Sequence, residues 1–385
     1  MPVYAERQKI RLLAMTPAWK IRRELKRLQQ QLASIPQWFW EPPALRRHDA
    51  WFDQDALIQN GQQPQQDRVA IVLLYQPNGL SQSTIDLFAH LTARGYAVLA
   101  VSNCPVPAQD WPLLRQSTWK ALERPNYGHD FGGYRDGIKV LWRLDITPER
   151  LVIVNDSIFY PLSDSDQTLE NLEALECDIG GIMMRIRDNF QFLESYFFSI
   201  SKIAFSHQAF RSFWRDYSVT SNKYKVIRRG ERGFSVAMLA AGLSVRSLYK
   251  RGKFAQCLND LSDAEIIQFL SHRALIYPEL DAKCDDILAR THQENWRTLV
   301  QNFIYEALLH GEFYSSFPVA SAKFLGYPVV KKSRDPAADL WRKAYVSAVL
   351  NGVIDQPNTA AWSEIYNMVH PVGPPESLLP EHYEN

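Results

Sequence analysis

Residues 124–137, RPNYGHDFGGYRDG, combine four glycines with side chains that can bind a polar ligand. Asn126 and Asp130 offer an amide and a carboxylate, Arg124 offers a cation, and Gly128 lies between Asn126 and Asp130. The spacing excludes two phosphate-binding loops, because the glycines do not follow G-x-G-x-x-G and no G-K-[ST] is present. We expect a loop whose glycines let the backbone approach a ligand, with ordinary turn geometry and helix capping by Asp130 as the alternatives.

A second polar group, N-D-S, ends the apolar run LVIVNDS. Asn155, Asp156 and Ser157 stand where a buried strand would reach its carboxyl end, which is where open α/β sheets bind ligands. Their alternative role is to form and cap a turn. Asp156 is the candidate ligand for Mg²⁺ or Mn²⁺, which prefer oxygen donors. One carboxylate would hold a metal weakly, so a basic side chain such as Arg124 could neutralise an anionic ligand instead.

The elements that must position these residues follow the pattern of a parallel sheet. Buried strands are predicted over 69–75, 96–103 and 150–160, and a helix over 80–95 ends at Gly95. Alternation of strand and helix indicates an α/β fold with a mostly parallel sheet and flanking helices. Further strands are expected in CDIGGIMM and FLESYFFSIS, and further helices in LENLEALE, SHQAFRSFWRDY, ERGFSVAMLAAG, HQENWRTLVQNFIYEALLHG and DPAADLWRKAYVSAVLNG.

The N-terminal segment is basic, with eight Lys or Arg against two Glu in the first 33 residues. Thr16 and Pro17 predict a helix start, and apolar residues then recur at helical spacing. Such a helix packs on its own domain or on a second copy, or it rests on an anionic membrane surface. We expect three parts: a basic helical arm (1–65), a sheet-containing domain (66–330) and a C-terminal helix with a proline-rich tail (331–385).

Composition narrows the class of protein. The net charge of +1 gives no electrostatic reason to expect a nucleic-acid partner. The four cysteines follow no metal-binding spacing, so we expect reduced thiols and a cytoplasmic location. No apolar run approaches the roughly 18 residues of a transmembrane helix. Any membrane contact would therefore be peripheral, on the inner face of the cytoplasmic membrane.

The pattern N-x-G-x-D-x-G after an Arg, followed by an apolar strand that ends in N-D-S, resembles the rhamnan synthesis protein F family. The segments ESYFFSISKIAFSHQAFRSFW, VIRRGERGFSVAMLAAG and HQENWRTLVQNF are also similar to that family, and the resemblance runs from about residue 68 to about 330. It implies a GT-A-like glycosyltransferase of bacterial polysaccharide or lipopolysaccharide O-chain assembly. The expected donor is a nucleotide sugar such as dTDP-L-rhamnose, and the expected acceptor is a growing lipid-linked glycan.

The resemblance also assigns roles to residues. Asp156 would lie at the donor diphosphate, with a metal if one is used. The remaining donor-binding residues would be Arg124, Asn126, Gly128, Asp130, Asn155 and Ser157.

An inverting transfer needs a carboxylate base for the acceptor hydroxyl. Glu231, expected at a helix start, is the candidate, and its alternative role is to stabilise that helix N-terminus. Asp188 and Glu194 are secondary candidates for the base. A noncatalytic sugar-binding or glycan-assembly protein with the same fold is the alternative function. The sequence leaves the donor sugar, the linkage and the oligomeric state open.

Overall fold

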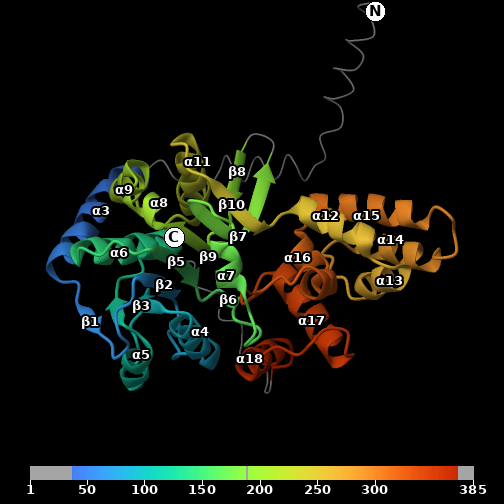
Figure 1. The fold of residues 1–385 in the computed structure, drawn as a ribbon, viewed down its shortest axis with the longest axis horizontal. Helices are drawn as coiled ribbons and strands as arrows, with labels where there is room; N and C mark the ends of the chain where they lie inside the picture. Colours follow the sequence, from blue (N-terminus) through green and yellow to red (C-terminus); the bar gives the residue numbers. More distant parts are fainter. Residues whose placement is uncertain (1–36, 188–189, 372–385) are drawn as a thin grey trace, which may run out of the picture.

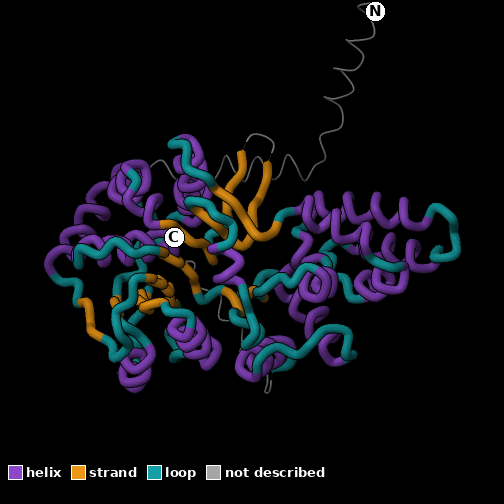
Figure 2. The backbone as a smooth tube through the Cα atoms, in the orientation of Figure 1, coloured by secondary structure: helices purple, strands orange, loops and turns teal. Residues whose placement is uncertain are grey.

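The computed structural model describes residues 37–187 and 190–371. Its centre is a nine-stranded sheet, covered by helices on both faces and extended on one side by a lobe of C-terminal helices (Figures 1 and 2). In spatial order the strands are β1 (Ile58–Asn60), β4 (Lys120–Glu123), β3 (Tyr96–Ser102), β2 (Arg68–Leu74), β5 (Arg150–Asn155), β9 (Phe197–Ser201), β7 (Ile179–Arg187) and β10 (Val245–Tyr249), with β8 (Phe190–Leu193) paired to β7.

The middle of the sheet is parallel, as the apolar runs predicted. β2 pairs in parallel with β3 on one side and with β5 on the other, and β3 pairs in parallel with β4. β9 is antiparallel to both β5 and β7, whereas β10 is parallel to β7. The predicted fold class, a mostly parallel sheet with flanking helices and a helical C-terminal region, is confirmed.

Alternate residues of the buried strands enter two hydrophobic cores. In β2, Val69, Ile71 and Leu73 face one core, and Ala70, Val72 and Leu74 face the other. Because side chains alternate across a strand, a strand covered on both faces is apolar at every position. The first core is closed by α3 (Gln37–Gln54), α6 (His129–Arg143), α8 (Lys202–Ser206), α9 (Gln208–Asp216) and α11 (Gly233–Ala240). The second is closed by α4 (Gln82–Ala93), α5 (Trp111–Ser117), α7 (Thr168–Glu173) and the C-terminal helices.

Two runs that the sequence predicted as single strands are interrupted in the structure. The run 150–160 forms β5, turns at Asp156 and Ser157, and continues as β6 (Ile158–Phe159). The run 192–201 is divided into β8 and β9 by the segment around Glu194 and Ser195. Both interruptions place polar residues where a strand ends, and residues from both belong to the candidate site described below.

Up to residue 371, where the described part ends, the C-terminal lobe contains seven α-helices and shares the second core with the sheet. Its strand β11 (Val330–Lys331) pairs antiparallel with β6 in a separate two-stranded sheet, and α18 packs on α4 (Figure 1). The helices are α12 (Arg251–Asp260), α13 (Asp263–Ser271), α14 (Pro278–Ala289), α15 (Trp296–His310), α16 (Phe313–Ser316), α17 (Pro336–Leu350) and α18 (Thr359–Val369).

The described part of the N-terminal segment packs on the sheet-containing domain. In α3, His48 Nε2 lies 2.8 Å from Asp136 Oδ2, and Asp49 forms an ion pair of 2.6 Å with Arg135. The helix predicted to begin at Thr16, and Asp188, lie outside the described residues. Across 37–187 and 190–371, no helix is both long and apolar enough to cross a membrane.

Candidate active site

The candidate site lies where the chain order of the sheet reverses. The chain leaves β2 toward β3 and β4 on one side and later returns to β5 on the other side of β2. The carboxyl ends of β2 and β5 therefore diverge into different connections, and such a switch point is where open α/β sheets bind ligands. Asp156 stands at this point, directly after β5.

Backbone contacts with the end of β2 hold Asp156 in place. Its amide donates to the carbonyl oxygen of Leu73 at 3.0 Å, and its Oδ2 accepts from the amide of Tyr75 at 2.7 Å. Burial raises the pKa of Asp156, whereas the Tyr75 amide and the charge of Lys332 act in the opposite direction. Tyr75 itself is 57% exposed beside this carboxylate, so its ring is available to a ligand.

Asn155 organises the neighbouring groups. Its side-chain amide donates to Asp130 Oδ2 at 3.2 Å and to the hydroxyl of Tyr134 at 3.1 Å, and its Oδ1 accepts from the amide of Ser157 at 3.2 Å. Asp130 belongs to the first turn of α6, and its pKa is raised by burial and by the charge of Asp156. The structure thus brings the polar groups of the two predicted motifs together.

Glu231 joins the same network through the segment between β8 and β9. Its Oε1 accepts from the amide of Ser195 at 3.1 Å and from the Ser195 hydroxyl at 3.4 Å. The Ser195 carbonyl accepts from the hydroxyl of Tyr134 at 2.8 Å, which is also bound by Asn155. Burial and the charge of Glu194 raise the pKa of Glu231. The carboxyl group is therefore nearer to the protonation range of a general base than an exposed glutamate is.

The backbone around Glu231 differs from the predicted helix start. Glu231 lies in a π-helical segment, Val226–Arg232, that continues directly into α11. Wide π-helical turns are rare in proteins overall, but those that occur are often found at functional sites. The sequence carries no pattern that distinguishes such a segment from an α-helix, which explains the difference.

Lys332 brings a positive charge to the site, and the sequence analysis did not select it. Its amide donates to the Ser157 carbonyl at 2.7 Å, because β11 pairs with β6. Its ammonium group donates to Ser83 Oγ at 2.8 Å and lies 3.6 Å from Glu364. Burial lowers the pKa of Lys332, whereas Glu364 and Asp156 favour its charged form. Lys332 is placed beside the site only by the pairing of β11 with β6, two strands that lie over 170 positions apart in sequence.

Arg124, which the sequence predicted at the donor, has a different environment. Its side chain is fully buried and forms an ion pair of 2.6 Å with Asp136. Its other nitrogens donate to Asn103 Oδ1 and to the Tyr127 carbonyl. The guanidinium group therefore has its partners inside the protein, and the structure favours a structural role.

Three residues of the glycine-rich stretch around the start of α6 differ in their surroundings. Asn126 is exposed. Gly128 is the left-handed N-cap of α6 with φ 86°, and a Cβ there would lie 2.1 Å from Val219 Cγ1. A side chain at Gly132 would lie 2.1 Å from the Tyr127 carbonyl oxygen. These glycines permit close packing within the protein. The sequence analysis had explained them by approach to a ligand or by turn geometry.

Glu194, a secondary candidate for the base, is held as a carboxylate between two cations. It forms ion pairs of 2.6 Å with Arg185 and 3.0 Å with Lys331, and it accepts from the Tyr314 hydroxyl at 2.9 Å. The opposing charges of Lys331 and Arg185 outweigh burial and lower the pKa of Glu194 to about 2. A group so strongly held in its ionised form is a poor proton acceptor.

The fit of the site to a divalent cation rests on two carboxylates. Among the described residues, no group of three or more His, Cys, Asp or Glu side chains is arranged to hold a metal ion. The charge of Asp156 raises the pKa of Asp130, so these two carboxylates interact electrostatically and are the candidates for holding such an ion. Mg²⁺ commonly uses one or two carboxylates and completes its shell with substrate phosphates and water.

Comparison with known proteins agrees with the family resemblance. The model of the family Rhamnan synthesis protein F matches residues 98–263, which include both polar motifs and Glu231. The chain is 27% identical over 354 residues to the uncharacterized protein y4gN of Sinorhizobium fredii, covering 90% of this chain and 91% of that protein.

Two solved structures are similar at low identity. One is a mannosyltransferase from Pyrobaculum calidifontis in complex with GDP-Man and Mn²⁺, with 12% identity and a TM-score of 0.31, covering 89% of this chain and 96% of that one. The other is a putative nucleotide-diphospho-sugar transferase from Desulfovibrio desulfuricans, with 12% identity and a TM-score of 0.27, covering 47% and 79%.

Proposed function

We propose that this chain is a glycosyltransferase that moves a sugar from a nucleoside diphosphate donor to a glycan acceptor. The match of residues 98–263 to the rhamnan synthesis protein F family supports the reaction class. The observation that carries the proposal is the grouping of Asp156, Asp130 and Glu231 around Asn155 and Tyr134 at the switch point.

The chemistry of sugar transfer matches these groups. The leaving nucleoside diphosphate gains negative charge as the glycosidic bond breaks, and a positive group close to it stabilises the transition state. Lys332 supplies a cation, and a Mg²⁺ or Mn²⁺ ion held by Asp156 and Asp130 would add Lewis-acid stabilisation. The exposed Tyr75 ring beside Asp156 offers a face for the nucleotide base.

Glu231 is proposed as the base of an inverting transfer. It would take the proton from the acceptor hydroxyl as that oxygen attacks the anomeric carbon and the diphosphate departs. Its raised pKa and its link through Ser195 to the donor-side network support this assignment. We further propose dTDP-L-rhamnose as the donor and a lipid-linked glycan as the acceptor, by the family resemblance.

Nucleotide binding tests the donor site. We expect at least one of dTDP, UDP and GDP to raise the melting temperature of the full chain, with the effect measured with and without Mn²⁺. Asp156→Ala should remove that shift. Asp164→Ala changes an exposed aspartate in the loop after β6 and should preserve it. If none of the three nucleotides shifts the wild-type protein under either condition, the donor site is refuted.

Transfer activity separates the enzyme from a noncatalytic binding protein. We expect the full chain to transfer the radiolabelled sugar of dTDP-L-rhamnose to an acceptor in membrane lipid extracts, or to hydrolyse the donor. Nucleotide binding without any transfer or hydrolysis would instead favour the noncatalytic function.

Membrane contact through residues 1–36 is part of the proposal, and equal liposome pelleting of chains with and without those residues would contradict it.

A further inference from the structure

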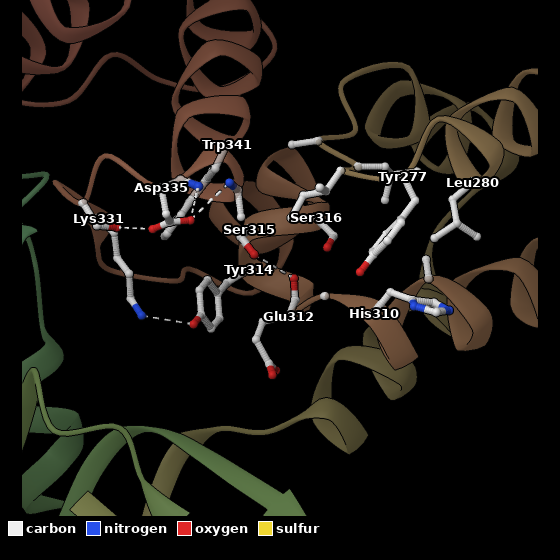
Figure 3. Close-up of a pocket in the computed structure, with 18 of the residues that line it drawn as sticks. Tyr277, Leu280, His310, Glu312, Tyr314, Ser315, Ser316, Lys331, Asp335 and Trp341 are labelled. Carbon is white, nitrogen blue, oxygen red and sulfur yellow. Dashed lines mark hydrogen bonds between the residues drawn. The ribbon is translucent and has the colours of Figure 1, made fainter. Parts of the chain in front are cut away.

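A cavity of about 220 Å³ lies in the C-terminal lobe, outside the donor site (Figure 3). It is formed where α14, α15, α16 and α17 meet β11 and the end of β7. Tyr277 and His310 lie on one side, Lys331 and Tyr314 on the other, with Glu312 between them (Figure 3). Tyr277 is 40% exposed at the rim, so the cavity can be reached from solvent.

Four side chains with rings contribute to the lining, and two of them, Tyr277 and His310, are exposed. The rings of Tyr277 and His310 contact each other edge to face at 5.0 Å, whereas those of Tyr314 and Trp341, which lie 5.3 Å apart, are only 3% and 2% exposed. Aromatic side chains offer flat apolar faces at low conformational cost, and their polar atoms can still bond to a ligand. The C–H faces of a pyranose ring pack well on such surfaces.

The charged groups of the lining are already paired. Arg185 lies 3.5 Å from Glu312, which is also 3.1 Å from Arg251, and Lys331 is paired with Glu194 at 3.0 Å. Asp335 accepts from the first amides of α17 as its N-cap. A further full charge would enter without a dedicated counterion, whereas hydroxyl groups could bond to these paired side chains. The lining therefore favours an uncharged ligand rich in hydroxyl groups.

Two residues that line the cavity are connected to the proposed catalytic base through the segment between β8 and β9. Lys331 and Arg185 line the cavity and both hold Glu194. The next residue, Ser195, binds Glu231 through its amide and hydroxyl. A ligand in the cavity would thus contact Lys331 and Arg185, which connect it through Glu194 to the segment that positions Glu231.

We infer that this cavity binds a neutral pyranose unit of the acceptor glycan. The assignment of this sugar to the acceptor rests on the proposed function. The assignment of a sugar to the cavity rests on the cavity itself. The size is suitable, because a cavity of about 150 Å³ accommodates a benzene ring and this one is larger. A single sugar ring fits, and the remainder of a longer glycan would extend past Tyr277 into solvent.

Saturation-transfer NMR with simple glycosides tests the site. The probes are methyl α-L-rhamnopyranoside, methyl α-D-mannopyranoside and methyl β-D-glucopyranoside with the full chain. We expect at least one to bind. Ala337→Trp, in the first turn of α17 and lining the cavity, should weaken that binding by at least about tenfold. Ala344→Trp is the matched control, since it lies farther along α17, outside the lining, and should bind as the wild type does.

Nucleotide binding measured on the same variants separates this inference from the donor site. Ala337→Trp should retain the thermal shift given by the nucleoside diphosphate. If the nucleotide binds but none of the glycosides does, or if a glycoside binds equally to Ala337→Trp, the cavity is not the sugar site and the donor site stands. If the glycoside binds, Ala337→Trp removes it, and no nucleotide binds, the cavity stands as a sugar site and the proposed transfer fails.

Discussion

Three carboxyl groups of this protein occupy different protonation environments within one connected region. The pKa of Asp156 and that of Glu231 are raised mainly by burial, whereas the pKa of Glu194 is lowered to about 2 by Lys331 and Arg185. Pairs of titratable groups with pKa values displaced in opposite directions are typical of acid–base sites. These directions support the proposal in which Glu194 stays charged and Glu231 accepts the proton.

Glu231→Gln tests this assignment. The amide oxygen of glutamine can still accept from Ser195, so the fold and nucleotide binding should be preserved. Without a base, we expect the transfer rate to fall by at least about a hundredfold. In the wild type the base acts when deprotonated, and its pKa is raised above the ordinary 4.5. The rate should therefore rise with pH through a value above 4.5.

Initial rates of sugar transfer between about pH 4 and pH 8 measure both effects, with nucleotide binding as the control for folding. An unchanged rate in Glu231→Gln would exclude Glu231 as the base. A wild-type acid limb centred at or below the ordinary glutamate pKa would show that another group controls the rate.

At the scale of elements, the glycines of α6 have no side chain, and this allows the helix to pack close to β2. Gly133 approaches the side chain of Leu73 in β2, where an added Cβ would lie 2.1 Å from Leu73 Cδ1. Close approach of α6 to β2 keeps Asp130 within reach of Asn155 at the end of β5. The glycine-rich composition of this stretch thus positions the site through helix–sheet packing.

Gly132→Ala tests the packing role. Alanine is ordinarily better than glycine inside a helix by about 1 kcal/mol. At Gly132, however, the added Cβ would lie 2.1 Å from the Tyr127 carbonyl oxygen, and backbone cannot move aside cheaply. We expect a loss of about 1–3 kcal/mol in the free energy of unfolding. Urea denaturation followed by circular dichroism measures it.

Gly252→Ala is the matched control for that substitution. Gly252 is also a helical glycine, in α12, and no atom lies within 4 Å of a Cβ added there. This variant should be as stable as the wild type or more stable. Equal stability of the two variants would mean that α6 tolerates a side chain at Gly132.

For the whole molecule, the central feature is the joining of the C-terminal lobe to the sheet. Lys331 reaches from β11 to Glu194 at the end of β8, and the hydroxyl of Tyr327 bonds to that of Tyr196 at 2.5 Å. Tyr196 and Tyr327 lie in a hydrophobic core shared by the two parts. The lobe therefore supplies Lys332 to the candidate site and most of the residues that line the cavity.

Glu194→Gln tests how strongly this junction stabilises the protein. The pKa of Glu194 is lowered from 4.5 to about 2, so the folded state favours its charged form. Its contribution, on the order of 3 kcal/mol, is present above pH 4.5 and is lost as pH falls toward 2. We expect the variant to lose stability at pH 7 and to show a shallower loss between pH 4.5 and pH 2.

Chemical denaturation at several pH values provides the measurement. Glu149→Gln removes the partner of an exposed ion pair with Lys202 and should cost no more than about 1 kcal/mol. If both glutamine variants lose the same small amount at pH 7, the buried cluster does not hold the lobe to the sheet.

The sequence by itself determined the parallel sheet and the main polar groups of the site. Continuous apolar runs indicate strands buried on both faces, and N-D-S at the end of one run fixes Asp156 at a strand terminus. These signals are local, because side-chain period and chain reversal are written in neighbouring residues. The short strands β1 and β4 were missed, because three or four residues carry too little pattern.

Tertiary structure alone decided which charges meet. Strand pairing places Lys332 at the candidate site, and Arg124 is buried in an ion pair with Asp136. Lys331 and Arg185 hold Glu194 in its charged form. A side chain's charge and pKa depend on burial and on partners that are distant in sequence. Residue type and spacing could therefore nominate these groups, and only the folded chain could assign each one its environment.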